Sequence, residues 1–247
     1  MRGGLAVLAL MLVAGPAQAQ ELTLTLGDGV ALETRTIQLL ALLTLLSLVP
    51  GLAMMVTCFP FVLTVLSILR QAIGLQAAPP NMLIVTLALF LTWFIMDPVF
   101  MAAWHDAGAP FSAGLIPIEE AVPRAVGPFR IFMTARVDPE TLQQLASLRP
   151  DMGEWPVTAD GLREVDQVPL SLLVPSFLLS EIERAFQIGF LVFLPFLVID
   201  LVVSAVLMSM GMMMVPPVMI ALPFKLAFFV VADGWTLIST ALVQGYG

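Results

Sequence analysis

The sequence predicts an all-α, membrane-associated protein in which helical hairpins flank a small polar insertion. Three observations carry this prediction. Hydrophobic residues make up 60% of the 247 residues and charged residues only 11%, with a mean hydropathy of +1.01, whereas soluble domains carry about a quarter charged residues. Long apolar runs alternate with turns rich in proline and glycine. The charged residues gather mostly in one central stretch rather than along the apolar runs.

Composition also excludes several classes of function. The net charge of −8 and the pI near 4.5 argue against nucleic-acid binding, which favours a basic surface. A single cysteine, Cys58, excludes an internal disulfide and a multi-cysteine metal site. The chain has no nucleophile elbow, phosphate loop or metalloprotease motif. We therefore predict no catalytic residue, no cofactor and no metal.

Residues 1–19 resemble a secretory signal peptide. Arg2 supplies the positive charge, residues 5–14 form an apolar core, and Ala17 and Ala19 form a small-x-small cleavage site. The apolar core is too short to span a bilayer. We expect cleavage before Gln20 and delivery of that end to the periplasm, with an uncleaved anchor as the alternative.

The N-terminal hairpin is predicted over residues 20–103. No charged residue occurs between Arg35 and Arg70, but Pro50, Gly51 and Pro60 are expected to interrupt this apolar run. Gly74 and residues 79–81 predict a turn, and a second apolar helix is expected from about Asn81 to Phe100.

Residues 104–170 are predicted to form a small polar domain on the periplasmic side. This stretch holds most of the acidic residues and the only histidine, His105, which we interpret as solvated. Residues 142–148 have helical apolar spacing, and the remainder is expected to form turns and short helices.

The C-terminal hairpin is predicted over residues 171–247. It is expected to start near Val174, with one apolar helix over residues 186–210 and a last helix over residues 219–243. Gly211 and the prolines at 216 and 217 predict the turn between these two helices.

Three consecutive methionines, Met212, Met213 and Met214, occupy that turn. Methionine is long, unbranched and polarizable, so a cluster of methionines adapts to irregular surfaces. In a ring of copies these side chains would form a soft apolar constriction around a passing polypeptide. The alternative is that they fill gaps in a core.

Three charged residues lie within the apolar C-terminal half: Asp200, Lys225 and Asp233. Charges in hydrocarbon are costly and mark candidate functional sites. Folding the last two helices antiparallel brings Asp200 level with Lys225, which predicts an ion pair within or between subunits. The alternative is that one or both face water in a pore.

Several blocks of this sequence resemble the FliP family of flagellar biosynthetic proteins. In the first half they are residues 69–74 (Leu-Arg-Gln-Ala-Ile-Gly), 79–81 (Pro-Pro-Asn), 87–96 and 98–99 (Pro-Val). In the second half they are residues 174–181, 185–190 (Ala-Phe-Gln-Ile-Gly-Phe), 194–202, 211–217, 222–226 (Leu-Pro-Phe-Lys-Leu) and 233–235 (Asp-Gly-Trp).

The resemblance implies a core, pore-forming subunit of the flagellar type III protein-export gate. It implies a homo-oligomer, with a pentamer expected, that forms part of a helical ring. FliQ and FliR are expected to complete the ring, and other export-apparatus membrane proteins are expected to bind it. The expected setting is the bacterial inner membrane and the flagellar basal body, in contact with lipid and with exported unfolded polypeptides. The alternatives are the equivalent subunit of a virulence-type injectisome and a non-conducting assembly scaffold.

The sequence departs from the family's pattern at a few positions. The family usually reads Thr-Ser-Phe-Thr-Arg where this chain has Thr57 to Phe61, so Pro60 and Phe61 replace a threonine and a basic residue. Glu183 stands in place of a common lysine, and Asp97 in place of a small residue. These changes remove partners for any salt bridge that the family makes there.

Overall fold

The computed structural model describes residues 54–74, 79–149, 168–212 and 214–246, together with scattered residues between 36 and 51. The expected signal peptide, with Ala17 and Ala19, lies outside the described residues. The chain divides into two compact units, Met1–Leu48 and Val49–Gly247. The second unit contains the helices from Phe59 onward.

Every regular element in this described part is helical, which confirms the predicted all-α class. In chain order the elements are α3 (Phe59–Ile73), α4 (Asn81–Ala103), a π-helical turn η1 (Trp104–Gly108), α5 (Ala109–Ser112), α6 (Ile118–Arg136), α7 (Pro139–Ser147), α8 (Leu170–Ser209), α9 (Pro217–Val231) and α10 (Gly234–Gln244).

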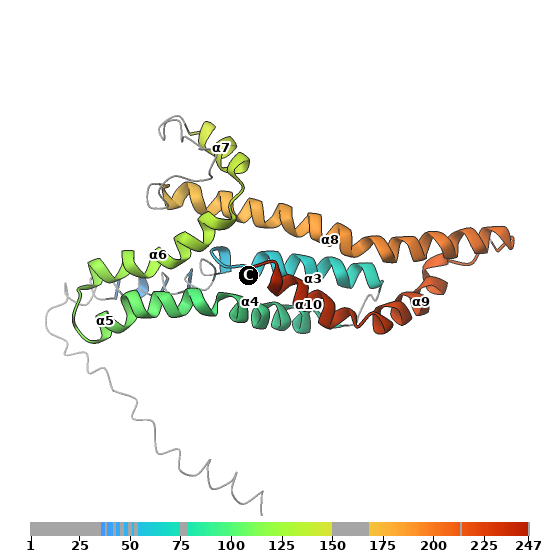
Figure 1. Cartoon of the computed structure of the whole chain (residues 1–247), viewed down its shortest axis with the longest axis horizontal. Coiled ribbons are helices and arrows are strands. Elements are labelled where there is room, and N and C mark those ends of the chain that lie inside the picture. The colour runs from blue at the N-terminus through green and yellow to red at the C-terminus, as the bar shows by residue number, and fades with distance from the viewer. Residues whose placement is uncertain are drawn as a thin grey trace, which may run out of the picture. The chain divides into compact units, whose positions relative to one another are not determined.

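Helix α3 forms the core of the second unit, between α8 and α4 (Figure 1). Its apolar side chains are buried around much of its circumference; Val62, Val65, Leu66 and Leu69 have no exposed surface. Burial of each such side chain contributes about 1.5–3 kcal/mol. On α8, Gly189 permits the close approach, because a Cβ there would lie 2.3 Å from Cδ1 of Ile68.

Helix α3 begins beside Pro60, where an interruption was expected, and ends before Gly74, where a turn was expected, and both ends have local causes. Pro60 lies in the first turn, where its missing N–H costs no helical hydrogen bond. At the other end Gly74 adopts a left-handed conformation with φ +87° and donates its N–H to the carbonyl of Gln71 at 3.1 Å. Glycine takes this conformation without a steric penalty.

The second apolar helix extends further than the sequence predicted. α4 begins at Asn81 as expected, but it passes Phe100 and continues without a turn through η1 and α5 to Ser112. The expected start of the polar segment, at residue 104, therefore falls inside a helix. Pro98 is tolerated within α4, where it removes only one backbone donor.

The polar segment is more helical than predicted. Instead of short helices and turns it holds the 19-residue α6, followed by α7 over the stretch with apolar spacing. Asp138 caps α7 by accepting a hydrogen bond from the N–H of Thr141 at 2.8 Å. A second hydrophobic cluster forms among α6, α7 and the start of α8, with Met133, Leu142, Leu173 and Phe177 almost fully buried.

Helix α8 begins sixteen residues before the expected apolar helix and runs unbroken for 40 residues. It contains two internal prolines, Pro175 and Pro195. The predicted last helix, over residues 219–243, is instead two helices, α9 and α10, which meet at a 61° bend. The bend lies at Asp233, the only non-glycine residue with positive φ (48°) in the described part of the chain.

Within the described residues, two helical segments are long and apolar enough to cross a membrane, residues 81–112 and residues 170–209. The bent pair α9–α10 would be a third if it counts as one span. α3 is apolar but has only 15 residues. These properties fit the predicted class of an all-α membrane protein.

Candidate functional site

The turn after α8 is fixed by its backbone. Gly211 has φ +74° and donates its N–H to the carbonyl of Met208 at 3.0 Å. The N–H of Met212 reaches the carbonyl of Leu207, also at 3.0 Å. This pair of hydrogen bonds is the Schellman motif, which ends helices at a left-handed glycine. The predicted glycine therefore ends α8 and turns the chain toward α9.

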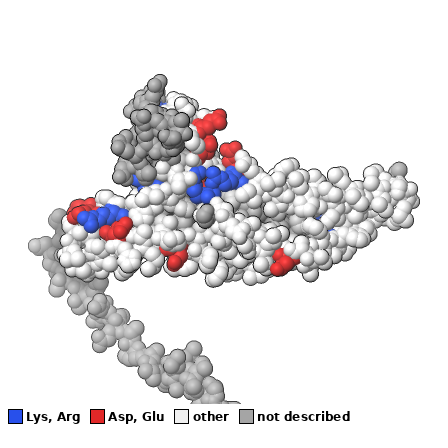
Figure 2. Space-filling model, in the orientation of Figure 1, with Lys and Arg blue, Asp and Glu red and all other residues white. Residues whose placement is uncertain are grey.

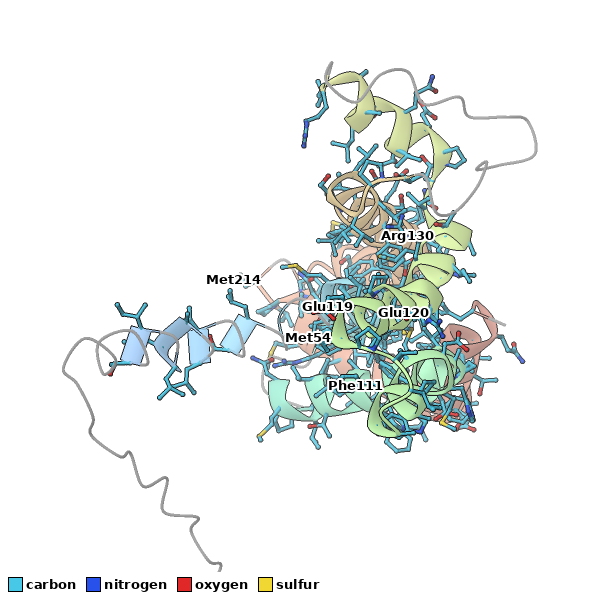
Figure 3. The ribbon with its side chains drawn as sticks, turned by 90° about the vertical axis from the view of Figure 1, so that its left-hand side faces the viewer. Met54, Phe111, Glu119, Glu120, Arg130 and Met214 are labelled. Atoms are coloured by element: carbon cyan, nitrogen blue, oxygen red, sulfur yellow. The ribbon has the colours of Figure 1, made fainter. Side chains whose placement is uncertain are left out.

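The methionines of this turn project outward from the unit. Met214, labelled in Figure 3, is 98% exposed and Met212 is 40% exposed. Met213 lies outside the described residues. Met208 and Met210, just before the turn, are also exposed. Within this unit Met212 and Met214 therefore do not fill a core.

The structure brings Asp200 of α8 and Lys225 of α9 together. Lys225 Nζ lies 2.6 Å from Asp200 Oδ2 and 3.0 Å from the carbonyl oxygen of Ala72. Lys225 is almost fully buried, and the Asp200 side chain is 30% exposed. The lysine therefore ties three helices together, because it takes one acceptor from each of α3 and α8.

This ion pair lies among apolar side chains, so Lys225 loses most of its hydration and the Asp200 carboxylate loses part of it. Asp200 Oδ1 is buried and has no hydrogen-bond partner among the described residues. Removing one member of a buried pair leaves the other uncompensated, which typically costs more than the pair itself contributes. The pair therefore fixes the α8–α9 hairpin against α3.

Asp233 has a different setting from the other two charges. It lies at the exposed break between α9 and α10, where Thr236 donates a hydrogen bond to its carboxylate at 3.1 Å. Asparagine and aspartate tolerate the left-handed conformation better than other side chains. The next residue, Gly234, packs under the ring of Phe229, where a Cβ would lie 2.2 Å from Cε2. Asp233 and Gly234 together allow the bend.

Sequence reasoning missed a second buried charge, Glu181 of α8, which has no exposed surface. Its Oε1 accepts a hydrogen bond from Nε of Arg136 at 2.9 Å, and a guanidinium nitrogen of Arg184 lies 3.5 Å away. Its Oε2 accepts the hydroxyl of Tyr246. One carboxylate therefore joins α6, α8 and the end of the chain.

Arg136 extends this network to the chain's end. It donates to the carbonyl oxygen of Gly245 at 3.0 Å, and its guanidinium carbon lies 3.7 Å from the centre of the Tyr246 ring. The ring also meets Phe61 edge-on, with centroids 5.4 Å apart. We call Arg136, Glu181, Arg184 and Tyr246 the Glu181 network.

The network changes the chemistry of its tyrosine. Burial, and then the negative charge of Glu181, raise the pKa of the Tyr246 hydroxyl well above its usual value. The hydroxyl therefore remains a proton donor to Glu181 across the physiological range. At the start of α3, burial raises the pKa of the Cys58 thiol to about 12, so this thiol stays protonated and unreactive.

A signal for Glu181 was present in the sequence. Leu173, Phe177, Glu181, Ala185 and Gly189 recur at four-residue spacing and are all buried. A carboxylate in that register lies on the core face of the helix and needs cationic or hydroxyl partners. Its partners lie 45 and 65 residues away in the chain, and nothing in the sequence pairs them.

No group of three or more His, Cys, Asp or Glu side chains suited to a metal ion occurs in the described part of the chain. The two buried polar sites hold helices together, and the methionine turn presents thioethers. These features define an all-α membrane protein whose two buried polar sites join its own helices.

Comparison with known proteins identifies the family. The model of the FliP family matches residues 42–242, so this chain belongs to the FliP family. The flagellar biosynthetic protein FliP of Caulobacter vibrioides is 43% identical over 243 residues, covering 98% of this chain and 88% of the relative. The Rhizobium meliloti protein of that name is 41% identical, covering 97% of each. That of Bacillus subtilis is 44% identical, covering 85% and 92%.

Membership of the FliP family indicates the general process in which this chain takes part. Its members are flagellar biosynthetic proteins, and this membership supports a role in the flagellar export apparatus. The family is not a known enzyme family. The apolar helices fit a membrane-embedded component of that apparatus.

Proposed function

We propose that this chain is a core pore-forming subunit of the flagellar type III protein-export gate, which conducts unfolded flagellar proteins across the inner membrane. One observation carries the proposal: the exposed methionine turn stands at the end of an apolar helical stretch that the unit itself leaves uncovered. Neighbouring protein would cover that stretch and bring the methionines of several copies together.

The far half of α8 presents a continuous apolar surface. Its exposed side chains are those of Phe190, Leu191, Leu197, Val198, Leu201, Val202, Val206 and Met208. Exposed apolar area of this extent marks contact with lipid or with other protein. The partly exposed carboxylate of Asp200 lies in the same stretch, and lipid alone does not explain a charge there. Coverage by neighbouring copies and partner subunits explains both, so we propose a homo-oligomer, expected to be a pentamer, completed by FliQ and FliR.

Methionine is suited to the constriction. Its side chain has three rotatable bonds and a polarizable sulfur, so it repacks around irregular surfaces. A ring of Met212, Met213 and Met214 from several copies would exclude hydrated ions when closed and deform around a passing chain. The Schellman turn at Gly211 holds the backbone of this ring while the side chains remain adaptable.

We also propose a location and a topology for this subunit. Residues 1–19 would act as a cleaved signal peptide, and the polar segment at residues 104–170 would face the periplasm between the hairpins 20–103 and 171–247. The subunit would then sit in the bacterial inner membrane within the flagellar basal body. Determination of the mature N-terminus by mass spectrometry tests the first step, with Gln20 expected.

A crosslinking experiment tests the pore. A cysteine introduced by Met214→Cys should crosslink to an export substrate that a folded C-terminal fusion has stalled in the gate. The native Cys58 contributes little background because its thiol is buried and protonated. The matched control is Leu148→Cys, which is 75% exposed on the polar segment and should not crosslink.

The outcomes separate the alternatives. Crosslinks at 214 alone support conduction, whereas gate assembly with no crosslink at 214 favours the non-conducting scaffold. Deletion of the gene should abolish motility and the secretion of hook and filament proteins, with rescue by the chain supplied in trans. Normal filaments in the deletion strain would contradict the flagellar role and favour the injectisome alternative.

A further inference from the structure

We propose that a cavity between the end of the first membrane-capable helix and α6 binds the zwitterionic headgroup of a membrane phospholipid. The cavity has a volume of about 470 Å³, within the size range of small-ligand sites. His105, Asp106 and Arg124 line it together with the apolar walls of Pro110, Pro128 and Ile131. This proposal goes beyond export and does not depend on the proposed pore.

The position of the cavity along the helix suits a headgroup. The segment of residues 81–112 has 32 residues, about 48 Å at 1.5 Å per residue. The hydrocarbon core of a bilayer is about 30 Å thick and takes about 20 residues. If the span begins at Asn81, residues beyond about 100 lie at the level of the headgroups. His105 and Asp106 fall within that part.

Trp104 reinforces this position. It is 55% exposed and directly precedes His105 and Asp106, and tryptophan prefers the boundary between membrane and water. Its ring packs over Gly108, where a Cβ would lie 2.3 Å from Cε3. Trp104 to Gly108 form the π-helical turn η1, and single π-turns within α-helices are frequent at functional sites.

The charges around the cavity have both signs. On α6, Arg124 forms an ion pair with Glu120 one turn earlier, while His105 and Asp106 come from η1. In Figure 2 a compact group of basic and acidic atoms stands at the left-hand end of the unit, within largely uncharged surface. A zwitterionic headgroup matches this arrangement, with its phosphate toward Arg124 and His105 and its amine toward Asp106 and Glu120.

The rim of the cavity suits acyl chains. Figure 3 looks onto this end of the unit, where Phe111 lies near Glu119 and Glu120 of α6. Pro110 and Pro128 line the cavity, and Ile131, which also lines it, is 62% exposed. An apolar rim around a mixed-charge cavity favours a phospholipid over a soluble zwitterion, because both parts of the lipid gain contacts.

Native mass spectrometry of the full-length chain, purified in mild detergent, tests the proposal. Three lipids with identical acyl chains are added in turn: phosphatidylethanolamine, phosphatidylglycerol and diacylglycerol. Phosphatidylethanolamine should be retained at least several-fold better than the other two, since only it carries both charges. This series uses the unaltered protein and stands even if a variant fails to fold.

A charge-removal variant then locates the site. The double substitution His105→Gln, Arg124→Gln should reduce retention of phosphatidylethanolamine roughly tenfold, while Arg149→Gln, an exposed arginine after α7, should leave it unchanged. Circular dichroism confirms that each variant keeps its helical content. Equal loss in both variants would overturn the assignment of the site.

Two further outcomes would also overturn the proposal. Equal retention of all three lipids would show that apolar contact alone holds them. Displacement of the lipid by millimolar phosphoethanolamine, with that soluble compound bound in its place, would show that the cavity takes a soluble ligand. Failure of these lipid experiments would leave the crosslinking test at residue 214 unaffected, so the two proposals fall separately.

Discussion

The two halves of α8 have the same secondary structure and opposite environments. In the first twenty residues, Leu170–Gly189, eight residues are buried, including Glu181. In the last twenty residues only Phe196 and Leu207 are buried. The first half packs against α3, α6 and α7, whereas much of the second half has no covering element in the unit (Figure 1). The subunit therefore covers one half of this helix with its own side chains. Much of the other half is left exposed to contact lipid or other protein.

The polar residues of α8 divide in the same way. The first half carries Ser176, Ser180 and Glu181, all buried and all hydrogen-bonded. The second half carries one charge, Asp200, whose Oδ1 has no partner among the described residues. A polar network that is fully satisfied specifies a unique arrangement. We therefore expect substitutions in the first half, and at Asp200, to act on folding of the subunit, and those at the exposed apolar positions of the second half to act on assembly.

The largest effect is expected at Glu181. Glu181→Ala removes the carboxylate and leaves Arg136 in a mostly buried position without its counter-charge, which should lower the free energy of unfolding by about 3–5 kcal/mol. Thermal or denaturant unfolding of the purified subunit in detergent measures this loss. Glu183→Ala, two residues along on an exposed position, is the matched control and should change stability by less than about 0.5 kcal/mol. Similar losses in both variants would contradict a structural role for the network.

The next largest effect is expected at the Asp200–Lys225 pair. Asp200→Leu leaves Lys225 buried with only the Ala72 carbonyl as partner, and should cost about 2–3 kcal/mol because the site is partly open to solvent. Adding Lys225→Met should recover most of this loss, since an apolar pair often replaces a buried ion pair without penalty. A double-mutant cycle on unfolding free energies tests the coupling. Additive losses would show that the two side chains do not depend on each other.

A smaller effect is expected at the hydroxyl of Tyr246. Tyr246→Phe keeps the ring contacts and removes one donor to Glu181, which should cost about 1–2 kcal/mol below pH 9. The folded state raises the pKa of this hydroxyl above its unfolded value, which is near 10. Its contribution is therefore fully present below pH 10 and lost as the pH rises further, because the unfolded state then releases the proton. The difference between wild type and variant should shrink above pH 10; a constant difference would place the hydroxyl outside the network.

The sequence predicted elements where a local signal sets the boundary. Gly74 and Gly211 end helices because glycine takes the left-handed conformation at low cost, and Pro60 lies in a first turn because its missing N–H has no helical role there. The contact between Asp200 and Lys225 also followed from local information, since a turn of known position sets the register of the two helices that it joins.

The elements that the sequence did not predict depend on distant contacts. Helix α8 begins sixteen residues before the predicted helix, because tertiary packing keeps it continuous through Pro175. The bend at Asp233 depends on the packing of the Phe229 ring over Gly234. The secondary-structure propensities of single residues do not predict that contact. The Glu181 network draws on α6 and the chain's end, so spacing reveals the buried carboxylate and not its partners.

The smallest effect on the subunit itself is expected in the far half of α8. Leu201→Gln changes a side chain that is 61% exposed, so the unfolding free energy of the purified subunit should shift by less than about 0.5 kcal/mol. Assembly should nevertheless fail, because a polar amide would lie without partners once neighbouring protein covers the surface. Size-exclusion chromatography of the extracted export complex measures assembly, and Leu148→Gln, 75% exposed on the polar segment, is the matched control. If Leu201→Gln assembled normally, this surface would face lipid or detergent instead, and the division of α8 into a folding half and an assembly half would be wrong.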